Sequence, residues 1–126
     1  MKKQRAEELV GKMSQLVEPA EDWHEVGAEN EPPFENSWSN FGSGWDTAAF
    51  YKTIDRVYIK GLVAGGTLNT TVFTLPEGYR PSASQMLIGE ENLYTHVRIK
   101  IGTDGTVTTN GGASNTYLSL WVSFRI

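Results

Sequence analysis

Apolar and polar residues alternate with a period of two in three segments of the chain, 56–63, 93–101 and 117–126. This alternation is typical of strands that bury one face, so we expect three long strands there. The expected inward-facing residues are Val57, Ile59, Val63, Leu93, Thr95, Val97, Ile99, Ile101, Leu118, Leu120, Val122, Phe124 and Ile126.

Turn signals separate these strands at short intervals. The β-branched segment 70–75 stops at Pro76, and Asp104-Gly105 stands between segments 93–101 and 106–109 as a hairpin signal. Residues 23–47 are rich in Gly, Pro, Asn and Ser, and predict loops that join very short strands. Short, evenly spaced strands predict an all-β fold, an antiparallel sandwich of jelly-roll-like type or a barrel.

The N-terminal segment has a different period. Over residues 5–22 the apolar side chains are spaced three and four apart, which predicts one apolar seam on a short helix. The seam consists of Ala6, Leu9, Met13, Leu16 and Ala20. We therefore divide the chain into a helix over residues 1–22 and a β-domain over residues 23–126. Either the helix packs on its own domain or frays, or it ends a longer stalk whose chains share the seam.

Charge and composition narrow the classes of partner. The net charge is −4, and residues 1–35 hold 4 basic and 9 acidic side chains, against 7 and 6 in residues 36–126. A nucleic-acid binder shows a basic stripe, which neither part has, so we expect no nucleic acid as a partner. No apolar stretch approaches the roughly 20 residues of a membrane span, so we expect no membrane insertion. There is no cysteine, which excludes disulfides and thiolate metal sites.

Four segments, in this order, resemble the C-terminal tip domain of bacteriophage tail fibres and related receptor-binding proteins. The most specific is Phe73-Thr74-Leu75-Pro76-Glu77-Gly78-Tyr79-Arg80-Pro81. The others are Trp23-His24-Glu25-Val26-Gly27 with the following segment 33–41, Ala49-Phe50-Tyr51-Lys52 with segment 56–63, and Asp104-Gly105 with Tyr117-Leu118-Ser119-Leu120 and Ser123-Phe124. Together they cover residues 23–126.

The resemblance implies a homotrimeric β-sandwich at the far end of a virion's tail fibre or baseplate. There it binds a polysaccharide on the bacterial cell surface and is joined to the rest of the fibre. Such tips commonly follow a stalk, which favours Leu9, Met13 and Leu16 as a three-chain seam. The family motifs also make Trp23 and Trp38 part of the scaffold.

Aromatic and polar side chains of the β-domain carry the expected binding chemistry. Sugars stack on aromatic rings and exchange directed hydrogen bonds with polar side chains, donating to carboxylates and accepting from N–H groups. The candidate glycan-binding residues are Trp45, Asp46, Tyr94, His96, Arg98 and Trp121. On the last strand Tyr117 and Trp121 alternate with serines, a face too aromatic to be fully solvated. We expect it to lie in the trimer interface, with Trp121 either packing there or contacting the receptor.

Two other functions remain open. One alternative is a purely structural trimerisation cap of a fibre. The other, with less support, is a fibre-borne glycan hydrolase, an enzyme that needs two carboxylates roughly 5–10 Å apart. Glu90 and Glu91 point to opposite faces of an extended strand, and no nucleophile elbow or nucleotide fingerprint is present. We therefore expect no enzymatic activity and no cofactor. The two histidines, His24 and His96, lack further ligands at suitable spacing, so we expect no metal site.

Overall fold

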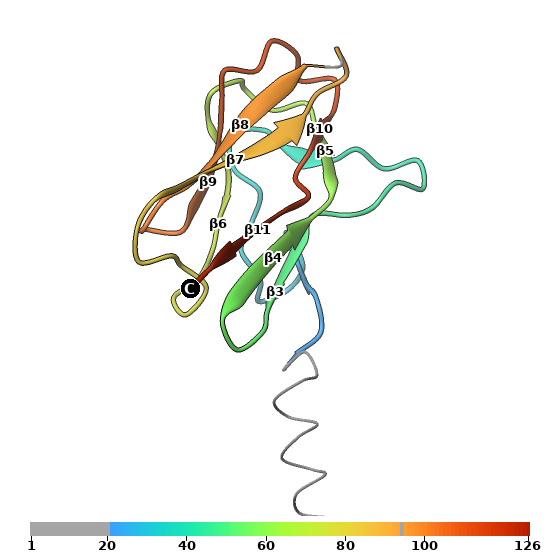
Figure 1. Ribbon diagram of the computed structural model, residues 1–126. Coiled ribbons are helices and arrows are strands. Elements are labelled where there is room, and N and C mark those ends of the chain that lie inside the picture. The colour runs from blue at the N-terminus through green and yellow to red at the C-terminus, as the bar shows by residue number, and fades with distance from the viewer. Residues whose placement is uncertain (1–20, 94) are drawn as a thin grey trace, which may run out of the picture.

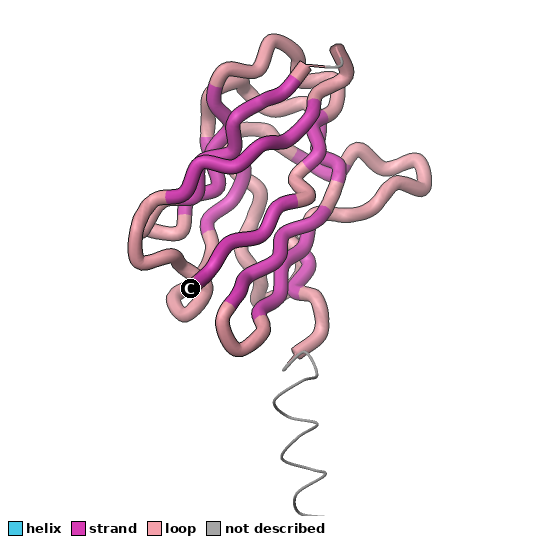
Figure 2. The backbone as a smooth tube through the Cα atoms, viewed as in Figure 1, coloured by secondary structure: helices cyan, strands magenta, loops and turns pink. Residues whose placement is uncertain are grey.

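The computed structural model describes residues 21–93 and 95–126, which form eleven strands and no helix within those ranges (Figures 1 and 2). The strands are β1 (His24–Glu25), β2 (Ser39–Asn40), β3 (Ala49–Lys52), β4 (Arg56–Lys60), β5 (Leu62–Ala64), β6 (Thr71–Thr74), β7 (Gln85–Glu90), β8 (His96–Ile101), β9 (Thr106–Asn110), β10 (Leu118–Ser119) and β11 (Val122–Arg125). The all-β prediction is confirmed. The expected helix and its seam of Leu9, Met13 and Leu16 lie outside the described residues.

The strands form two layers, and every strand pair is antiparallel. One layer is the four-stranded sheet β6-β9-β8-β7, and the other consists of a four-stranded sheet, β1-β3-β4-β11, and a three-stranded sheet, β10-β5-β2. A bridge between Glu91 and Leu118 links the end of β7 to β10, where the layers meet. The expected antiparallel sandwich is therefore the observed architecture, and the hairpin at Asp104-Gly105 joins β8 to β9 as predicted.

The second layer is broken at one glycine. Gly61 separates β4 from β5 with a φ of 125°, and a Cβ there would lie 2.5 Å from the Ala48 Cα atom. The partner strand is broken beside it, because Leu120 and Trp121 separate β10 from β11 while the Leu120 N–H donates to the Gly61 carbonyl at 2.9 Å. This double break leaves the Trp121 side chain 60% exposed on the outer surface.

The core lies between the layers and follows the predicted alternation with three exceptions. Most inward-facing residues of the three long segments are fully buried, among them Val57, Ile99 and Leu118. Leu93, however, is 53% exposed and Thr95 is exposed too, because β8 begins only at His96 and both residues precede it. Ile126 is also exposed, because it follows the last residue of β11.

A polar cluster fixes the first described residue to the β-domain. The two ring nitrogens of His24 lie 2.7 Å from a carboxylate oxygen of Glu21 and 2.7 Å from one of Glu31, and its ring stacks on Phe50. The Tyr79 hydroxyl donates to Glu21 at 2.6 Å. Because a histidine donates from both nitrogens only when protonated, the geometry favours the imidazolium.

The cluster predicts how stability depends on pH. The hydrogen bond to Glu21 raises the pKa of His24 above 6.5, against the effect of burial, so its stabilisation is complete below pH 6.5 and is lost as pH rises through the raised pKa. The pKa of Glu21 falls below 4.5, because hydrogen bonds from His24 and Tyr79 outweigh burial, so its stabilisation is lost as pH falls through that pKa. We expect the protein to be most stable between about pH 4.5 and 6.5.

Urea unfolding between pH 4 and pH 9 measures this profile. His24→Gln should flatten the decline above pH 6.5, whereas His96→Gln, which changes an exposed histidine of β8, should keep it. A profile with the same decline in the His24 variant and the wild type would contradict the assignment.

Candidate functional site

Trp121 lines two neighbouring hollows on the outer surface. The first, which we call the aromatic trough, has a volume of about 300 Å³ and is formed by Trp23, Tyr51, Tyr58, Ile59, Trp121, Val122 and Ser123. The second, which we call the acidic pocket, has a volume of about 280 Å³ and is formed by Trp45, Asp46, Leu62, Glu90, Glu91, Tyr117, Ser119 and Trp121. One exposed indole therefore serves both surfaces.

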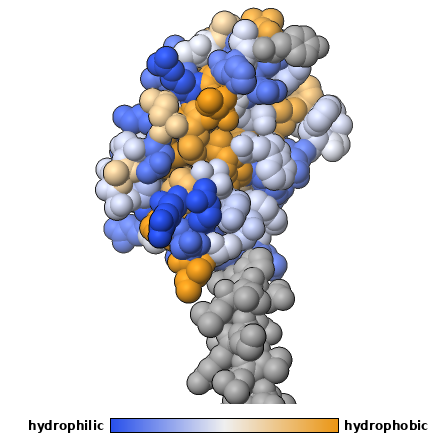
Figure 3. Space-filling model, in the orientation of Figure 1, coloured by the Kyte–Doolittle hydropathy of each residue, from blue (hydrophilic) through white to orange (hydrophobic). Residues whose placement is uncertain are grey.

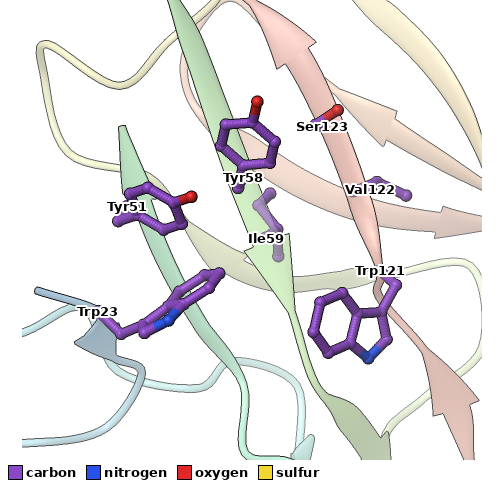
Figure 4. Close-up of a pocket in the computed structure, with 7 residues that line it drawn as sticks. All are labelled: Trp23, Tyr51, Tyr58, Ile59, Trp121, Val122 and Ser123. Atoms are coloured by element: carbon purple, nitrogen blue, oxygen red, sulfur yellow. The ribbon is translucent and has the colours of Figure 1, made fainter. Parts of the chain in front are cut away.

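Strand register builds the aromatic trough. Tyr51 of β3, Tyr58 of β4 and Ser123 of β11 are cross-strand neighbours, so their side chains form one row on the outer face. The two tyrosine rings stack at 5.2 Å, and the Trp23 ring meets Tyr51 edge-on at 4.4 Å. In Figure 4 the small Ser123 side chain lies near Tyr58, and the Trp23 and Trp121 rings lie on opposite sides of β4. The trough offers flat apolar rings with hydroxyl groups at their edges.

A projecting loop forms one wall of the acidic pocket. Figure 1 shows the segment between β2 and β3 standing away from the sandwich. At its tip the Trp45 N–H donates to the Gly42 carbonyl at 3.0 Å, and the two residues between them, Ser43 and Gly44, both have positive φ, as in a type I′ turn. Trp45 is 62% exposed, while the Asp46 carbonyl accepts a hydrogen bond from Leu62 N–H at 3.0 Å. The base of the loop is thus attached to β5 and its indole is presented to solvent.

Two of the pocket's carboxylates are already engaged within the protein. Asp46 forms a salt bridge of 2.9 Å with Lys60, whose side chain is largely buried. Glu91 is buried and accepts hydrogen bonds from the Thr95 hydroxyl and from the backbone N–H groups of Ala113, at 2.8 Å, and Ser114, at 3.0 Å. The hydrogen bond from Thr95 has the largest effect on the pKa of Glu91. Together with the two backbone hydrogen bonds it outweighs the effect of burial and lowers that pKa. Glu91 therefore stays ionised and holds the loop around Ala113.

The structure brings together four of the residues expected from the sequence. Trp45, Asp46, Tyr117 and Trp121 line the acidic pocket. His96 and Arg98 are exposed on β8, where they pair with Glu90 and Ile88 of β7, and neither lines either hollow. Tyr94 lies outside the described residues.

Most of the aromatic trough and one side of the acidic pocket were not predicted from the sequence. Trp38 is buried as expected of scaffold, but Trp23 is 39% exposed and lines the trough. The signal for Tyr58 was present, since it alternates with the buried Val57 and Ile59. Strand β7, which carries Glu90, was not predicted, because Met86 and Ile88 face solvent and the segment lacks an apolar inner row.

Residues 21–93 and 95–126 offer neither a cluster of metal ligands nor a membrane-spanning helix. In these ranges no group of three or more His, Cys, Asp or Glu residues is placed to hold a metal ion. The same ranges contain no helix with the length and apolar character needed to cross a membrane.

Comparison with known proteins relates this geometry to a solved structure. The receptor binding protein (gp15) of Listeria phage PSA superposes on the chain with a TM-score of 0.66. The fold is that of a phage receptor-binding protein. The match covers 98% of this chain and 76% of the phage protein at 16% sequence identity. Neither a protein-family model nor a curated protein matches the sequence.

Proposed function

We propose that this chain is the receptor-binding tip of a phage or phage-tail-like fibre or baseplate, and that it attaches the particle to a polysaccharide of the bacterial surface. The observation that carries the proposal is a pair of hollows lined by exposed Trp and Tyr on a fold shared with a phage receptor-binding protein. Exposed indoles in concave sites offer the flat apolar surfaces on which sugar rings stack.

The proposal includes assembly as a homotrimer. Figure 3 shows apolar side chains gathered on one face over β7 and towards β11, and Met86 and Ile88 are the exposed large apolar residues of β7. An apolar edge strand of this kind is a liability for a lone protomer, and packing against identical chains removes it from water. Three copies per tip also turn weak sugar contacts into firm attachment through effective concentration.

Binding accounts for the acidic pocket better than hydrolysis does. A glycosidase needs a carboxylic acid whose pKa is raised, so that it can donate a proton to the leaving group. The pKa of Glu91, the buried carboxylate of the pocket, is lowered instead, and Asp46 is paired with Lys60. We therefore propose a site that binds glycan without cleaving it.

Retention of the labelled full chain on a panel of bacterial cell walls tests the proposal. We expect saturable binding to the walls of some strains, competition by soluble polysaccharide from those strains and no release of reducing ends. Light scattering should give a mass three times the 14.0 kDa of the chain. A trimer that no wall retains would instead support a structural cap, release of reducing ends would support a hydrolase, and a 14.0 kDa particle would remove the assembly argument.

A further inference from the structure

The acidic pocket has an unusual balance of charge. Its lining includes three carboxylates, Asp46, Glu90 and Glu91, and no lysine, arginine or histidine. Among the described residues, Lys60 neutralises Asp46 from outside the lining set. The pocket therefore keeps an excess of negative charge, which favours a positively charged ligand group and opposes a phosphate.

The two glutamates have different roles in this charge. Both Glu91 oxygens accept hydrogen bonds from the protein, so Glu91 contributes a fixed charge at the pocket floor. Glu90 is exposed at the end of β7, and within residues 21–93 and 95–126 its carboxylate makes no hydrogen bond or salt bridge. Its nearest partner in the strand register is His96 of β8. Glu90 is thus the carboxylate able to bind a ligand directly.

Aromatic rings form most of the rest of the lining, together with Leu62 and Ser119. Trp45, Tyr117 and Trp121 line the same pocket, and both indoles are exposed. Aromatic rings with a nearby carboxylate are the arrangement that binds ammonium groups, because the ring faces attract a cation and the carboxylate pairs with it. The same rings accept the apolar face of the sugar that bears the amine.

We propose that the acidic pocket selects glycans carrying a free, protonated amino group. The amino group lies between Trp45 and Trp121 and forms an ion pair with Glu90. This inference rests on the proposed function, since it names the ligand class of that site. The aromatic trough, whose lining contains no carboxylate, binds uncharged sugar units of the same polysaccharide.

Chemical N-acetylation of the ligand tests the inference, because it removes the positive charge and keeps the sugar. The polysaccharide purified from walls that the protein retains is titrated by calorimetry before and after N-acetylation, and a linear hexamer of glucosamine serves as a defined competitor. We expect N-acetylation to weaken binding at least about tenfold, and the hexamer to compete where its N-acetylated form does not.

Two charge-matched variants complete the test. Glu90→Gln should weaken binding of the untreated polysaccharide about tenfold and leave binding of the N-acetylated form unchanged. Glu77→Gln, which removes an exposed carboxylate that lines neither hollow, should change neither. Equal binding of the two forms of polysaccharide, or no effect of Glu90→Gln, overturns the inference. If the wild type is still retained on cell walls in that case, the proposed receptor-binding function stands. Failure of the wild type to bind any wall overturns both.

Discussion

Replacing Trp121 by alanine is expected to remove most binding to the bacterial surface while leaving the fold intact. Trp121 contributes to both hollows, so its loss opens the aromatic trough and the acidic pocket together. Aromatic residues at the centre of a binding surface typically contribute about 2 kcal/mol, which is roughly a 30-fold loss of affinity per site. Calorimetry with soluble polysaccharide measures this loss of affinity per site. Retention on cell walls measures the larger loss expected when several sites bind at once.

The matched control is Ile54→Ala. Ile54 is also a large apolar residue, is 77% exposed, and lies in the turn between β3 and β4, away from both hollows. It should bind as the wild type does. Wild-type affinity in the Trp121 variant would contradict our placement of the site. A Trp121 variant that loses the trimer mass would show that this residue packs between subunits.

Gly61→Ala is expected to cause a large loss of stability. A Cβ at this position would lie 2.5 Å from the Ala48 Cα atom and 2.7 Å from its nitrogen, so the clash is with backbone. The residue also has a φ of 125°, which residues other than glycine rarely adopt. Strain and overpacking together predict a loss of about 3–5 kcal/mol. Urea unfolding followed by tryptophan fluorescence, at one protein concentration, measures it.

Gly111→Ala separates the two causes. Gly111 has a φ of 84°, but nothing lies within 4 Å of the position of a Cβ there. This variant should lose only the conformational part, about 1 kcal/mol. If both variants lose the same amount, the close approach of Gly61 to Ala48 does not limit stability and our account of the broken sheet is wrong.

The sequence predicted the fold well wherever one face of a strand is buried. Alternation located β4, β8 and β11 because Val57, Ile99 and Phe124 are core residues that recur at every second position. It did not locate β7, in which Met86 and Ile88 face outward and Gly89 is the only fully buried residue. Nor did it predict the break at Gly61, since Lys60-Gly61-Leu62 continues the alternation and the φ of Gly61 depends on contacts with Ala48.

The candidate site was predictable in part for a related reason. Trp45 and Asp46 follow a Gly-Ser-Gly turn, and loop aromatics are recognisable as binding candidates without a structure. His96 and Arg98 have suitable chemistry but stand on the outer face of β8, outside both hollows. Which residues meet around Trp121 depends on the pairing of strands far apart in the chain, such as β4 with β11.

The projecting loop has a consequence for how this protein changes over generations. Its tip closes through its own hydrogen bond between Trp45 and Gly42, and no atom of the sandwich lies within 4 Å of a Cβ built at Gly42 or Gly44. Insertions and exchanges at the tip therefore leave the packing beneath it unchanged. Under the proposed receptor-binding function, substitution of a few solvent-facing residues of this loop changes which bacterial surface is recognised and keeps the same scaffold.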